Sequence, residues 1–370
     1  MKILSVVGAR PNFMKIAPIC RALDAAKEQY PDKKVRNILV HTGQHYDENM
    51  SKVFFDDLEI PRPDVNLEVG SGSHAQQTAG VMVRFEKLCV HEKPDLVIVV
   101  GDVNSTLACS VVASKLWIPV AHVEAGLRSF DRRMPEEINR VVTDALSEYL
   151  FTTCREADDN LKREGISPEK IHFVGNVMID SLYHSLPKAK ESTIKRDMGL
   201  GADPYALVTL HRPSNVDDDK TFERILGGLV NVSEKMTVVF PVHPRTGKKI
   251  EYTDAAERIK AHKGLRIVDP VGYHDFLALM KDAAVLLTDS GGIQEETTVL
   301  SVPCLTLREN TERPVTISEG TNELVGTDME KLTAEVDRIL NGNAKKGNIP
   351  ELWDGKAAER IVANILGLEL

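Results

Sequence analysis

The sequence lacks the features of secreted and membrane proteins. It has five cysteines in 370 residues, none spaced as Cys-x-x-Cys. Scattered cysteines in odd number predict free thiols rather than a disulfide framework or a zinc site. No apolar run approaches the ~20 residues that a membrane-spanning helix needs. The amino terminus, MKILSVV, is too short for a secretory signal and suits a first strand. We expect a cytoplasmic protein without a membrane segment.

The sequence also has no basic excess and no common nucleotide fingerprint. Its 46 Lys and Arg against 55 Asp and Glu give a net charge of −9, which argues against a nucleic-acid partner. Residues 8–15 read as strand, turn and helix, but they match neither GxGxxG nor GxxxxGK[ST], so neither NAD nor Mg-ATP is implied. His41 and His45 are four residues apart, yet Gly43 between them disfavours a helical metal pair. We expect no cofactor and no metal.

What the sequence does contain is a repeated alternation of short apolar strands and helical segments. Continuous apolar strands between helices are typical of parallel sheets covered on both faces. The chain is also longer than one hydrophobic core usually supports. We predict an α/β protein with two Rossmann-like doubly wound domains. The expected strands are residues 3–7, 38–40, 96–100, 120–123, 206–210, 237–242, 285–288 and 304–307.

The domain boundary is expected at residues 175–176, in the Val-Gly-Asn segment that ends at Asn176, with the charged, Pro-containing stretch 187–204 as the alternative. The N-terminal domain then covers residues 1–175 and the C-terminal domain residues 176–355. A last helical segment, within residues 356–370, follows a stretch rich in Gly, Asn and Pro and is assigned to the first domain.

Polar side chains stand directly after the expected strands in both halves. Ligands of open α/β sheets bind outside the carboxyl ends of the strands. Each residue alone can be a turn former or a helix cap, but their number favours a ligand cleft that both domains share. The set is Arg10, Asp102, Glu124, His211, His243 and Asp289-Ser290.

Residues 290–292, Ser-Gly-Gly, predict an anion site at a helix start. The glycines let a ligand approach the backbone, and the free N–H groups of the first turn bind anions. A diphosphate fits there, and Glu296 one turn further on is placed to accept hydrogen bonds from ribose hydroxyls. The structural alternative is that Asp289 or Ser290 only caps the helix, while the glutamates complement its dipole.

Cations at other positions also indicate that the protein binds an anionic ligand. Arg10 and Lys15 lie near the amino end of an expected helix, where cations oppose the dipole, so an anionic ligand would favour them. Arg313 can add a further cationic contact; its alternative is an ordinary surface arginine.

Three carboxylates point to acid/base chemistry. Asp102, Glu124 and Glu136 lie in Gly- or Pro-containing segments. Acids close to a phosphate site would repel the ligand, which indicates that they act on a proton rather than bind. His211 can stabilise a leaving phosphate. The alternative for each carboxylate is a helix cap or a salt bridge, and it should hold for at least one of Glu136 and Glu137.

The motifs, taken in order, resemble the non-hydrolysing UDP-N-acetylglucosamine 2-epimerases. They are GARPNFMK at 8–15, GDVNST at 101–106, HVEAGLRS at 122–129, MPEEINR at 134–140, HR at 211–212, DSGGIQEE at 289–296 and TERP at 311–314. The resemblance implies two domains of the glycosyltransferase-B type, a homodimer, and a UDP-sugar substrate bound by the C-terminal domain. It also implies interconversion of UDP-GlcNAc and UDP-ManNAc by anti elimination of UDP to a 2-acetamidoglucal and re-addition, supplying surface polysaccharides.

The same resemblance assigns individual residues. Asp102, Glu124, Glu136 and His211 match the catalytic positions, and the base that takes the C2 proton stays open. The substrate-binding positions are Arg10, Lys15, Phe276, Ser290, Gly291, Gly292, Glu296 and Arg313.

Two departures from the family pattern keep alternatives open. Gln44 and His243 match part of an allosteric site, but an expected arginine is replaced around Gln76-Gln77. Residues 41–50 and 128–140 also resemble the branch that acts on UDP-2,3-diacetamido uronic acids, whereas residues 311–314 favour UDP-GlcNAc. A UDP-sugar glycosyltransferase and a non-catalytic sugar-nucleotide sensor are the remaining alternatives.

Overall fold

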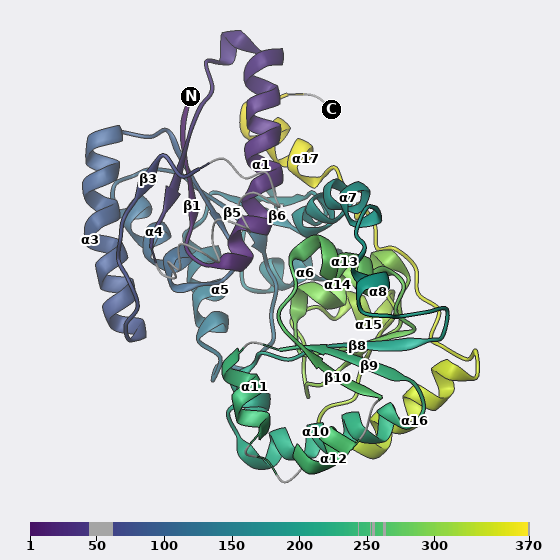
Figure 1. Ribbon diagram of the computed structural model, residues 1–370. Helices are drawn as coiled ribbons and strands as arrows, with labels where there is room; N and C mark the ends of the chain where they lie inside the picture. Colours follow the sequence, from purple (N-terminus) through teal and green to yellow (C-terminus); the bar gives the residue numbers. More distant parts are fainter. Residues whose placement is uncertain (44–61, 243, 252, 254–255, 262–263, 369–370) are drawn as a thin grey trace. The chain divides into compact units, whose positions relative to one another are not determined.

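The computed structural model describes the chain except for residues 44–61, 243, 252, 254–255, 262–263 and 369–370 (Figure 1). The chain forms two compact units. Unit 1 comprises Met1–His184 and Glu351–Leu370, and unit 2 comprises Ser185–Pro350. The division falls inside helix α7 (Val177–Lys190), between the boundary expected at residues 175–176 and the alternative stretch 187–204. The first turns of α7 belong to unit 1 because Ser181 Oγ donates a hydrogen bond to the backbone carbonyl of Met14.

Unit 1 is built on a parallel sheet in the order β3-β2-β1-β4-β5-β6-β7. Its strands are β1 (Lys2–Val7), β2 (Arg36–His41), β3 (Val65–Asn66), β4 (Leu96–Val100), β5 (Val120–Ala125), β6 (Tyr149–Thr152) and β7 (Ile171–Phe173). Its helices are α1 (Arg10–Gln29), α3 (His74–Glu92), α4 (Asn104–Lys115), α5 (Pro135–Leu146), α6 (Arg155–Arg163) and α17 (Ala357–Leu366), with 3-10 turns η1 (Pro31–Lys33) and η2 (Pro168–Lys170).

Unit 2 repeats the same plan with the order β10-β9-β8-β11-β12-β13, again with parallel pairs. Its strands are β8 (Tyr205–Thr209), β9 (Thr237–Pro241), β10 (Leu265–Val268), β11 (Val285–Thr288), β12 (Cys304–Thr306) and β13 (Asn322–Leu324). Its helices are α8 (Ile194–Asp197), α9 (Pro213–Val216), α10 (Asp219–Ser233), α11 (Pro244–Glu251), α12 (Ala256–Ala261), α13 (Tyr273–Lys281), α14 (Gly291–Leu300), α15 (Val315–Ser318) and α16 (Met329–Leu340).

The central strands are apolar on both faces because helices cover both faces of each sheet. Every residue of β4 is buried, and Val97 and Val99 pack with Phe85 of α3 in the core of unit 1. In unit 2 the strands β8 and β11 pack their apolar side chains with Phe222 and Leu229 of α10. Two doubly wound parallel units confirm the predicted α/β class with Rossmann-like domains of the glycosyltransferase-B type.

Each sheet has a point where the strand order turns back on itself. In unit 1 it lies between β1 and β4, and in unit 2 between β8 and β11. The connections from these neighbouring strands run in opposite directions, which opens a crevice at their carboxyl ends where doubly wound proteins bind ligands. Four of the residues singled out in the sequence follow these strands, namely Arg10, Asp102, His211 and Asp289, whereas Glu124 lies at the end of β5.

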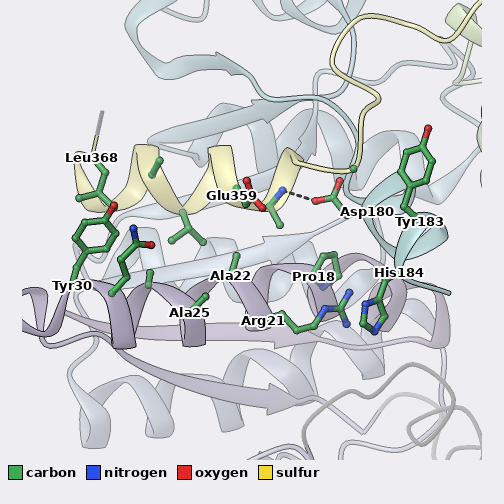
Figure 2. Close-up of a pocket in the computed structure, with 16 residues that line it drawn as sticks. Pro18, Arg21, Ala22, Ala25, Tyr30, Asp180, Tyr183, His184, Glu359 and Leu368 are labelled. Carbon is green, nitrogen blue, oxygen red and sulfur yellow. Dashed lines mark hydrogen bonds between the residues drawn. The ribbon is translucent and has the colours of Figure 1, made fainter. Parts of the chain in front are cut away.

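The last helix returns to unit 1. Helix α17 packs on α1 (Figure 1), and Trp353, which is 1% exposed, donates its indole N–H to the Thr153 carbonyl at 2.8 Å. Asp180 of α7 accepts hydrogen bonds from the backbone N–H groups of Ala357 and Ala358 at 3.1 and 2.7 Å. Figure 2 shows Asp180 at the start of α17, beside a cavity of about 630 Å³ between α1, α7 and α17. Throughout the described ranges every helix is too short or too polar to cross a membrane.

Candidate active site

Lys15 and Glu124 meet at the switch point of unit 1. Lys15 lies in the second turn of α1, and its Nζ is 2.5 Å from Glu124 Oε2 at the end of β5. Both residues are buried, with 8% and 3% exposure. Gly101, which follows β4, lies under this pair: a Cβ there would approach Lys15 Nζ to 2.9 Å, and its φ is +66°. Only glycine fits this position without strain.

Glu124 has an unusual backbone conformation. Its φ is +71°, and the pairing of β5 with β6 shifts register between Val123 and Ala125. A non-glycine residue in the left-handed region costs roughly 1–3 kcal/mol and persists where the surroundings demand it, which is common at functional sites. This strain supports a functional role for Glu124 over that of a salt-bridge partner alone.

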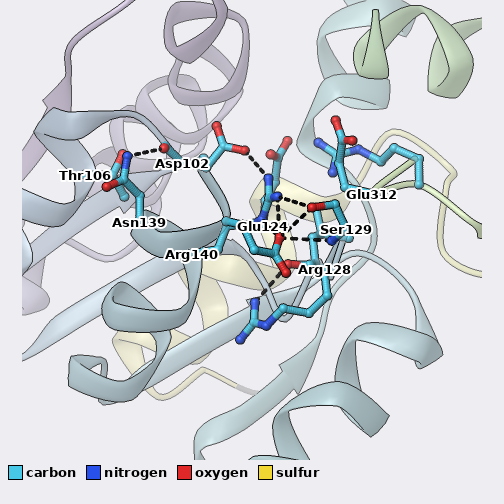
Figure 3. A network of polar contacts seen from close by, with 12 residues as sticks. Asp102, Thr106, Glu124, Arg128, Ser129, Asn139, Arg140 and Glu312 are labelled. Carbon is cyan, nitrogen blue, oxygen red and sulfur yellow. Dashed lines mark hydrogen bonds and ion pairs between the residues drawn. The ribbon is translucent and has the colours of Figure 1, made fainter. Parts of the chain in front are cut away.

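Asp102 is held by an arginine that we did not single out in the sequence. Arg140 of α5 is 2% exposed, and its Nη1 lies 2.5 Å from Asp102 Oδ2 while its Nη2 lies 2.5 Å from Glu137 Oε2 (Figure 3). Asn139 also donates to the Asp102 backbone carbonyl at 2.8 Å. The spacing of Glu137 and Arg140, one helical turn, was a readable signal for their pair. Nothing in the sequence indicated the contact with Asp102.

Glu136 and Glu137 separate into two environments. Glu137 is buried and accepts backbone hydrogen bonds from Ser129 and Phe130, each at 2.9 Å. Burial alone would raise the pKa of Glu137, but these bonds and Arg140 outweigh it and lower the pKa. Glu136 is half-buried, and its side chain makes no hydrogen bond or ion pair with the described part of the chain. The structural alternative therefore holds for Glu137, and Glu136 stays available.

In unit 2, Asp289 organises the loop after β8. It is 0% exposed and accepts hydrogen bonds from the backbone N–H groups of His211 and Arg212 and from the Asn215 amide. Burial alone would raise the pKa of Asp289, but the hydrogen bonds from His211 and Arg212 lower it. His211 Nδ1 lies 3.0 Å from the carboxylate, so this nitrogen carries a proton.

The start of α14 is not capped by a side chain. Ser290 occupies the N-cap position without a side-chain cap hydrogen bond, and Asp289 binds the β8 loop instead. Helix α14 starts at Gly291, and the first N–H groups of a helix have no partner within it. The alternative that Asp289 or Ser290 merely caps this helix is wrong, and the uncapped start suits an anion.

Charged groups surround this helix start. A Cβ on Gly291 would lie 2.9 Å from Glu312 Oε1. Glu312 pairs with Arg308 Nη2 at 2.7 Å and with Arg212 Nη2 at 3.3 Å. Burial alone would raise the pKa of Glu312, but the arginines around it hold the pKa far below its ordinary value. Arg313 is 6% exposed, so it is no ordinary surface arginine, and its Nε lies 2.5 Å from Glu295 Oε1.

Glu296 and Phe276 lie on neighbouring helices of unit 2. Glu296 of α14 is 2% exposed and accepts a hydrogen bond from the hydroxyl of Tyr273, at the start of α13. Phe276 follows one turn later on α13 and is half-buried. Sequence reasoning missed Tyr273, although its position one turn before Phe276 was a usable signal.

Some of the sequence candidates are outside this description. Gln44 and His243 lie outside the described residues, as does the side chain of Arg10, whose backbone begins α1. Among the described residues, no group of three or more His, Cys, Asp and Glu side chains is arranged to hold a metal ion.

These features define the class of the protein. The switch point of unit 1 carries a cluster of a lysine, carboxylates and an arginine. The switch point of unit 2 carries the uncapped start of α14, with the buried carboxylates Asp289 and Glu296 on either side of it in the sequence. This combination is typical of α/β enzymes that act on nucleotide-linked substrates.

Comparison with known proteins assigns the chain to one family within this class. A family model described as UDP-N-acetylglucosamine 2-epimerase matches residues 27–366. The UDP-N-acetylglucosamine 2-epimerase of Methanocaldococcus jannaschii is 46% identical over 368 residues, 98% of each chain. The UDP-2,3-diacetamido-2,3-dideoxy-D-glucuronate 2-epimerase of Pseudomonas aeruginosa is 40% identical over 365 residues, also 98% of each. The chain belongs to the UDP-N-acetylglucosamine 2-epimerase family, whose members are isomerases.

A solved structure agrees with this assignment. The crystal structure of the Methanocaldococcus jannaschii UDP-GlcNAc 2-epimerase in complex with UDP-GlcNAc and UDP has a TM-score of 0.88 and 45% identity, with 99% of both chains covered. The resemblance drawn from the motifs is thus confirmed.

Proposed function

We propose that this protein interconverts UDP-GlcNAc and UDP-ManNAc. The observation that carries the proposal is the buried Lys15–Glu124 pair beside Asp102 at the switch point of unit 1. It supplies carboxylates for moving a proton and a cation for an anionic ligand. The similarity to an enzyme crystallised with UDP-GlcNAc and UDP supports the choice of substrate.

In this proposal unit 2 binds the UDP portion. The N–H groups at the start of α14, at Gly291 and Gly292, receive the diphosphate, with Ser290 and Arg313 as further contacts. In unit 1, Arg10 and Lys15 are the proposed substrate-binding cations. Glu296 accepts hydrogen bonds from the ribose hydroxyls, and Phe276 lies near uracil. His211 donates its Nδ1–H to Asp289, and as an imidazolium it also donates Nε2–H to a phosphate oxygen and stabilises the departing UDP.

The chemistry falls to the carboxylates of unit 1. One of Asp102, Glu124 and Glu136 removes the proton from C2, the C–H electrons form a C1–C2 double bond, and the C1–O bond breaks to release UDP. The product is 2-acetamidoglucal. Return of a proton to the opposite face of C2, with re-addition of UDP oxygen to C1, gives the epimer. The site must also exclude water, which would trap the intermediate.

The test is proton NMR of the purified protein with UDP-GlcNAc in D2O. We expect solvent deuterium at C2 of both UDP-GlcNAc and UDP-ManNAc, with no acceptor present. Epimerisation without label at C2 would contradict the elimination route. If no UDP-ManNAc forms, the protein is instead a UDP-sugar glycosyltransferase or a non-catalytic sensor.

A second substrate has one specific observation in its favour, the 40% identity to the Pseudomonas aeruginosa enzyme named for UDP-2,3-diacetamido-2,3-dideoxy-D-glucuronate. Parallel assays with both UDP-sugars decide between them. We expect turnover of UDP-GlcNAc to be the faster.

We further propose that the protein is a homodimer in the cytoplasm. Its five cysteines are buried free thiols, which suits the reducing cytoplasm.

The dimer is proposed from exposed apolar side chains. Val83 and Val90 are exposed on α3, and Trp117, after the neighbouring α4, is 94% exposed. Exposed apolar side chains on adjacent helices are typical of an interface. Light scattering coupled to gel filtration tests it: Trp117→Glu should shift a dimer towards the monomer, and a wild-type monomer would refute it.

A further inference from the structure

A buried polar network lies behind the loops of unit 1 that carry Asp102 and Glu124. It joins His122 of β5, Arg128 after β5 and Asp144 of α5, which are 0%, 3% and 1% exposed. The sequence motif at 122–129 drew attention to Glu124 but gave no role to His122 or Arg128. Neither these residues nor Asp144 has a place in the reaction described above.

Asp144 is the centre of this network. Its Oδ1 lies 2.6 Å from His122 Nδ1, and its Oδ2 lies 2.7 Å from Arg128 Nη2. Oδ2 also accepts the backbone N–H of Gly126 at 3.1 Å. Burial alone would raise the pKa of Asp144, but His122 and Arg128 outweigh it and lower the pKa, so the carboxyl is ionised and only accepts hydrogen bonds.

His122 is hydrogen-bonded through both ring nitrogens. Nε2 lies 2.9 Å from the backbone oxygen of Gly101, and a carbonyl oxygen only accepts. Nδ1 faces the ionised Asp144, which also only accepts. Both nitrogens must therefore donate, which makes His122 an imidazolium cation.

The charges of the network agree with that state. Arg128 pairs at its far side with Glu164, at 2.6 Å between Nη2 and Oε2. With His122 charged, the two cations His122 and Arg128 balance the two anions Asp144 and Glu164.

The network connects to the site through two backbone groups. Gly101 directly precedes Asp102, and Gly126 is two residues after Glu124. Asp144 therefore holds the loop after β4 through His122 and the loop after β5 through the Gly126 N–H. A Cβ on Gly126 would meet the Ala157 carbonyl oxygen at 2.4 Å, so this loop also has little room to shift.

We propose that His122 and Asp144 are positioning residues: the buried imidazolium–carboxylate pair fixes the spacing between Asp102 and Glu124 so that both reach the same sugar carbon. The proposal rests on the proposed function, in which these carboxylates move the C2 proton. Placement errors of about 1 Å can cost about 10²-fold in rate even when no reacting group is lost.

The first measurement is spectroscopic and needs no turnover. In 15N-histidine-labelled wild-type protein at about pH 8, where an ordinary histidine is neutral, one histidine should show two protonated ring nitrogens. His122→Asn should remove both signals. If no histidine carries two ring protons under these conditions, the proposal is overturned, whether or not any variant folds.

The second measurement separates positioning from mere stability. His122→Asn should lower kcat by about 10²-fold while KM and UDP affinity stay within about twofold, because the His122 ring nitrogens contact Asp144 and Gly101 and no residue proposed to bind UDP. The matched control is Glu164→Gln, at the far end of the same network and with a partly exposed side chain. It should lower the melting temperature and leave kcat unchanged.

The outcomes are distinguishable from failure of the proposed function. If the wild-type protein shows no exchange at C2, the proposed function is wrong, but the NMR result on the His122 imidazolium still stands. A folded His122→Asn variant with wild-type kcat, or a fall in kcat equally large in Glu164→Gln, overturns the positioning role.

Discussion

The hydroxyl of Tyr273 donates a 2.7 Å hydrogen bond to Oε1 of Glu296, a carboxyl that is 2% exposed. Burial raises the pKa of Glu296 to about 7; the hydrogen bond from Tyr273 opposes this rise and the charge of Glu295 adds to it. Near neutral pH the free protein thus holds Glu296 in both protonation states. Both oxygens of Glu296 are free of a proton and accept hydrogen bonds only in the ionised form, so binding of the two ribose hydroxyls is coupled to loss of a proton.

The first prediction is that affinity for UDP-GlcNAc depends on pH through Glu296. The pKa is raised, so the protonated form prevails below about 7 and must lose its proton to bind. Affinity should fall by up to about tenfold per pH unit below pH 7 and level off above it. UDP-GlcNAc is the suitable ligand because its diphosphate does not titrate in this range. Calorimetry at a series of pH values measures the effect.

Two variants test the assignment to this pair. Glu296→Gln should bind more weakly and without the pH dependence. Tyr273→Phe removes a bond that favours the ionised form, so its affinity should level off at a higher pH than in the wild type. An unchanged slope in Glu296→Gln would assign the dependence to another group.

The second prediction concerns the helix start at α14. Gly291→Val should weaken UDP binding by at least 10²-fold, because the side chain collides with Glu312 and blocks the approach of a diphosphate to the backbone. Gly227→Val is the matched control, since a Cβ on Gly227 in α10 meets nothing within 4 Å. Calorimetry with UDP should leave the control near the wild-type affinity. A folded Gly291→Val protein with unchanged affinity would remove the diphosphate from this site.

The sequence predicted the site loops better than the contacts between them. Strand periodicity and the polar residues after each strand placed Asp102 and Glu124 at one sheet edge, because the ends of parallel strands share an edge. Lys15 was predicted near the start of the helix that follows the first strand. The strand order was not readable, so the switch points between β1 and β4 and between β8 and β11 came only with the structure.

Contacts between residues that are far apart in the sequence were also not predictable. The Asp102–Arg140 pair spans 38 residues, and no local spacing rule covers it. The separation of Glu136 from Glu137 likewise depends on the loop at Ser129 folding over the start of α5. Helical periodicity gives the face of a residue, but the neighbouring loop decides which of two adjacent acids it buries.

The third prediction concerns Asp180, which binds the start of α17. Burial raises the pKa of Asp180 from 3.8 to about 6, against the hydrogen bonds from Ala358 and Ala357, which lower it. The neutral form is favoured in the folded state, so its contribution is present below about pH 4 and is lost as pH rises through about 6. Relative to Asp180→Asn, which does not titrate, the wild type should lose about 2–3 kcal/mol over this range. Paired denaturant titrations at pH 4 and 6.5 measure the difference.

Asp180→Ala tests the structural role of the carboxyl group at the start of α17. Loss of the acceptor for two backbone N–H groups should cost about 1–2 kcal/mol and speed hydrogen exchange in the first turn of α17. Ser233, at the end of α10 in unit 2, provides a control: its Oγ bonds only a local carbonyl, and Ser233→Ala should leave exchange in α17 unchanged. A stability gap between wild type and Asp180→Asn that does not change with pH would contradict the shifted pKa.

The last prediction sets catalytic carboxylates against structural ones. Asp102→Asn, Glu124→Gln and Glu136→Gln keep size and hydrogen-bonding capacity but remove the charge. Turnover should fall by roughly 10²–10⁴-fold if these groups move protons. Glu136→Gln should leave the melting temperature unchanged, because Glu136 makes no hydrogen bond within the described residues. At least one variant should retain UDP binding and release traces of 2-acetamidoglucal, since blocked re-addition strands the intermediate.

Glu137→Gln is the matched control, one position along the same helix. It should have the opposite signature: about 1–3 kcal/mol less stability, because Glu137 accepts bonds from Ser129, Phe130 and Arg140, and the smaller loss of turnover of the adjacent pair. Kinetics and thermal melts on all four variants separate the two cases. Near-normal turnover in Asp102→Asn, Glu124→Gln and Glu136→Gln together would refute acid/base catalysis at this site. A Glu137→Gln variant that melts like the wild type but loses all turnover would transfer the catalytic role from Glu136 to its neighbour.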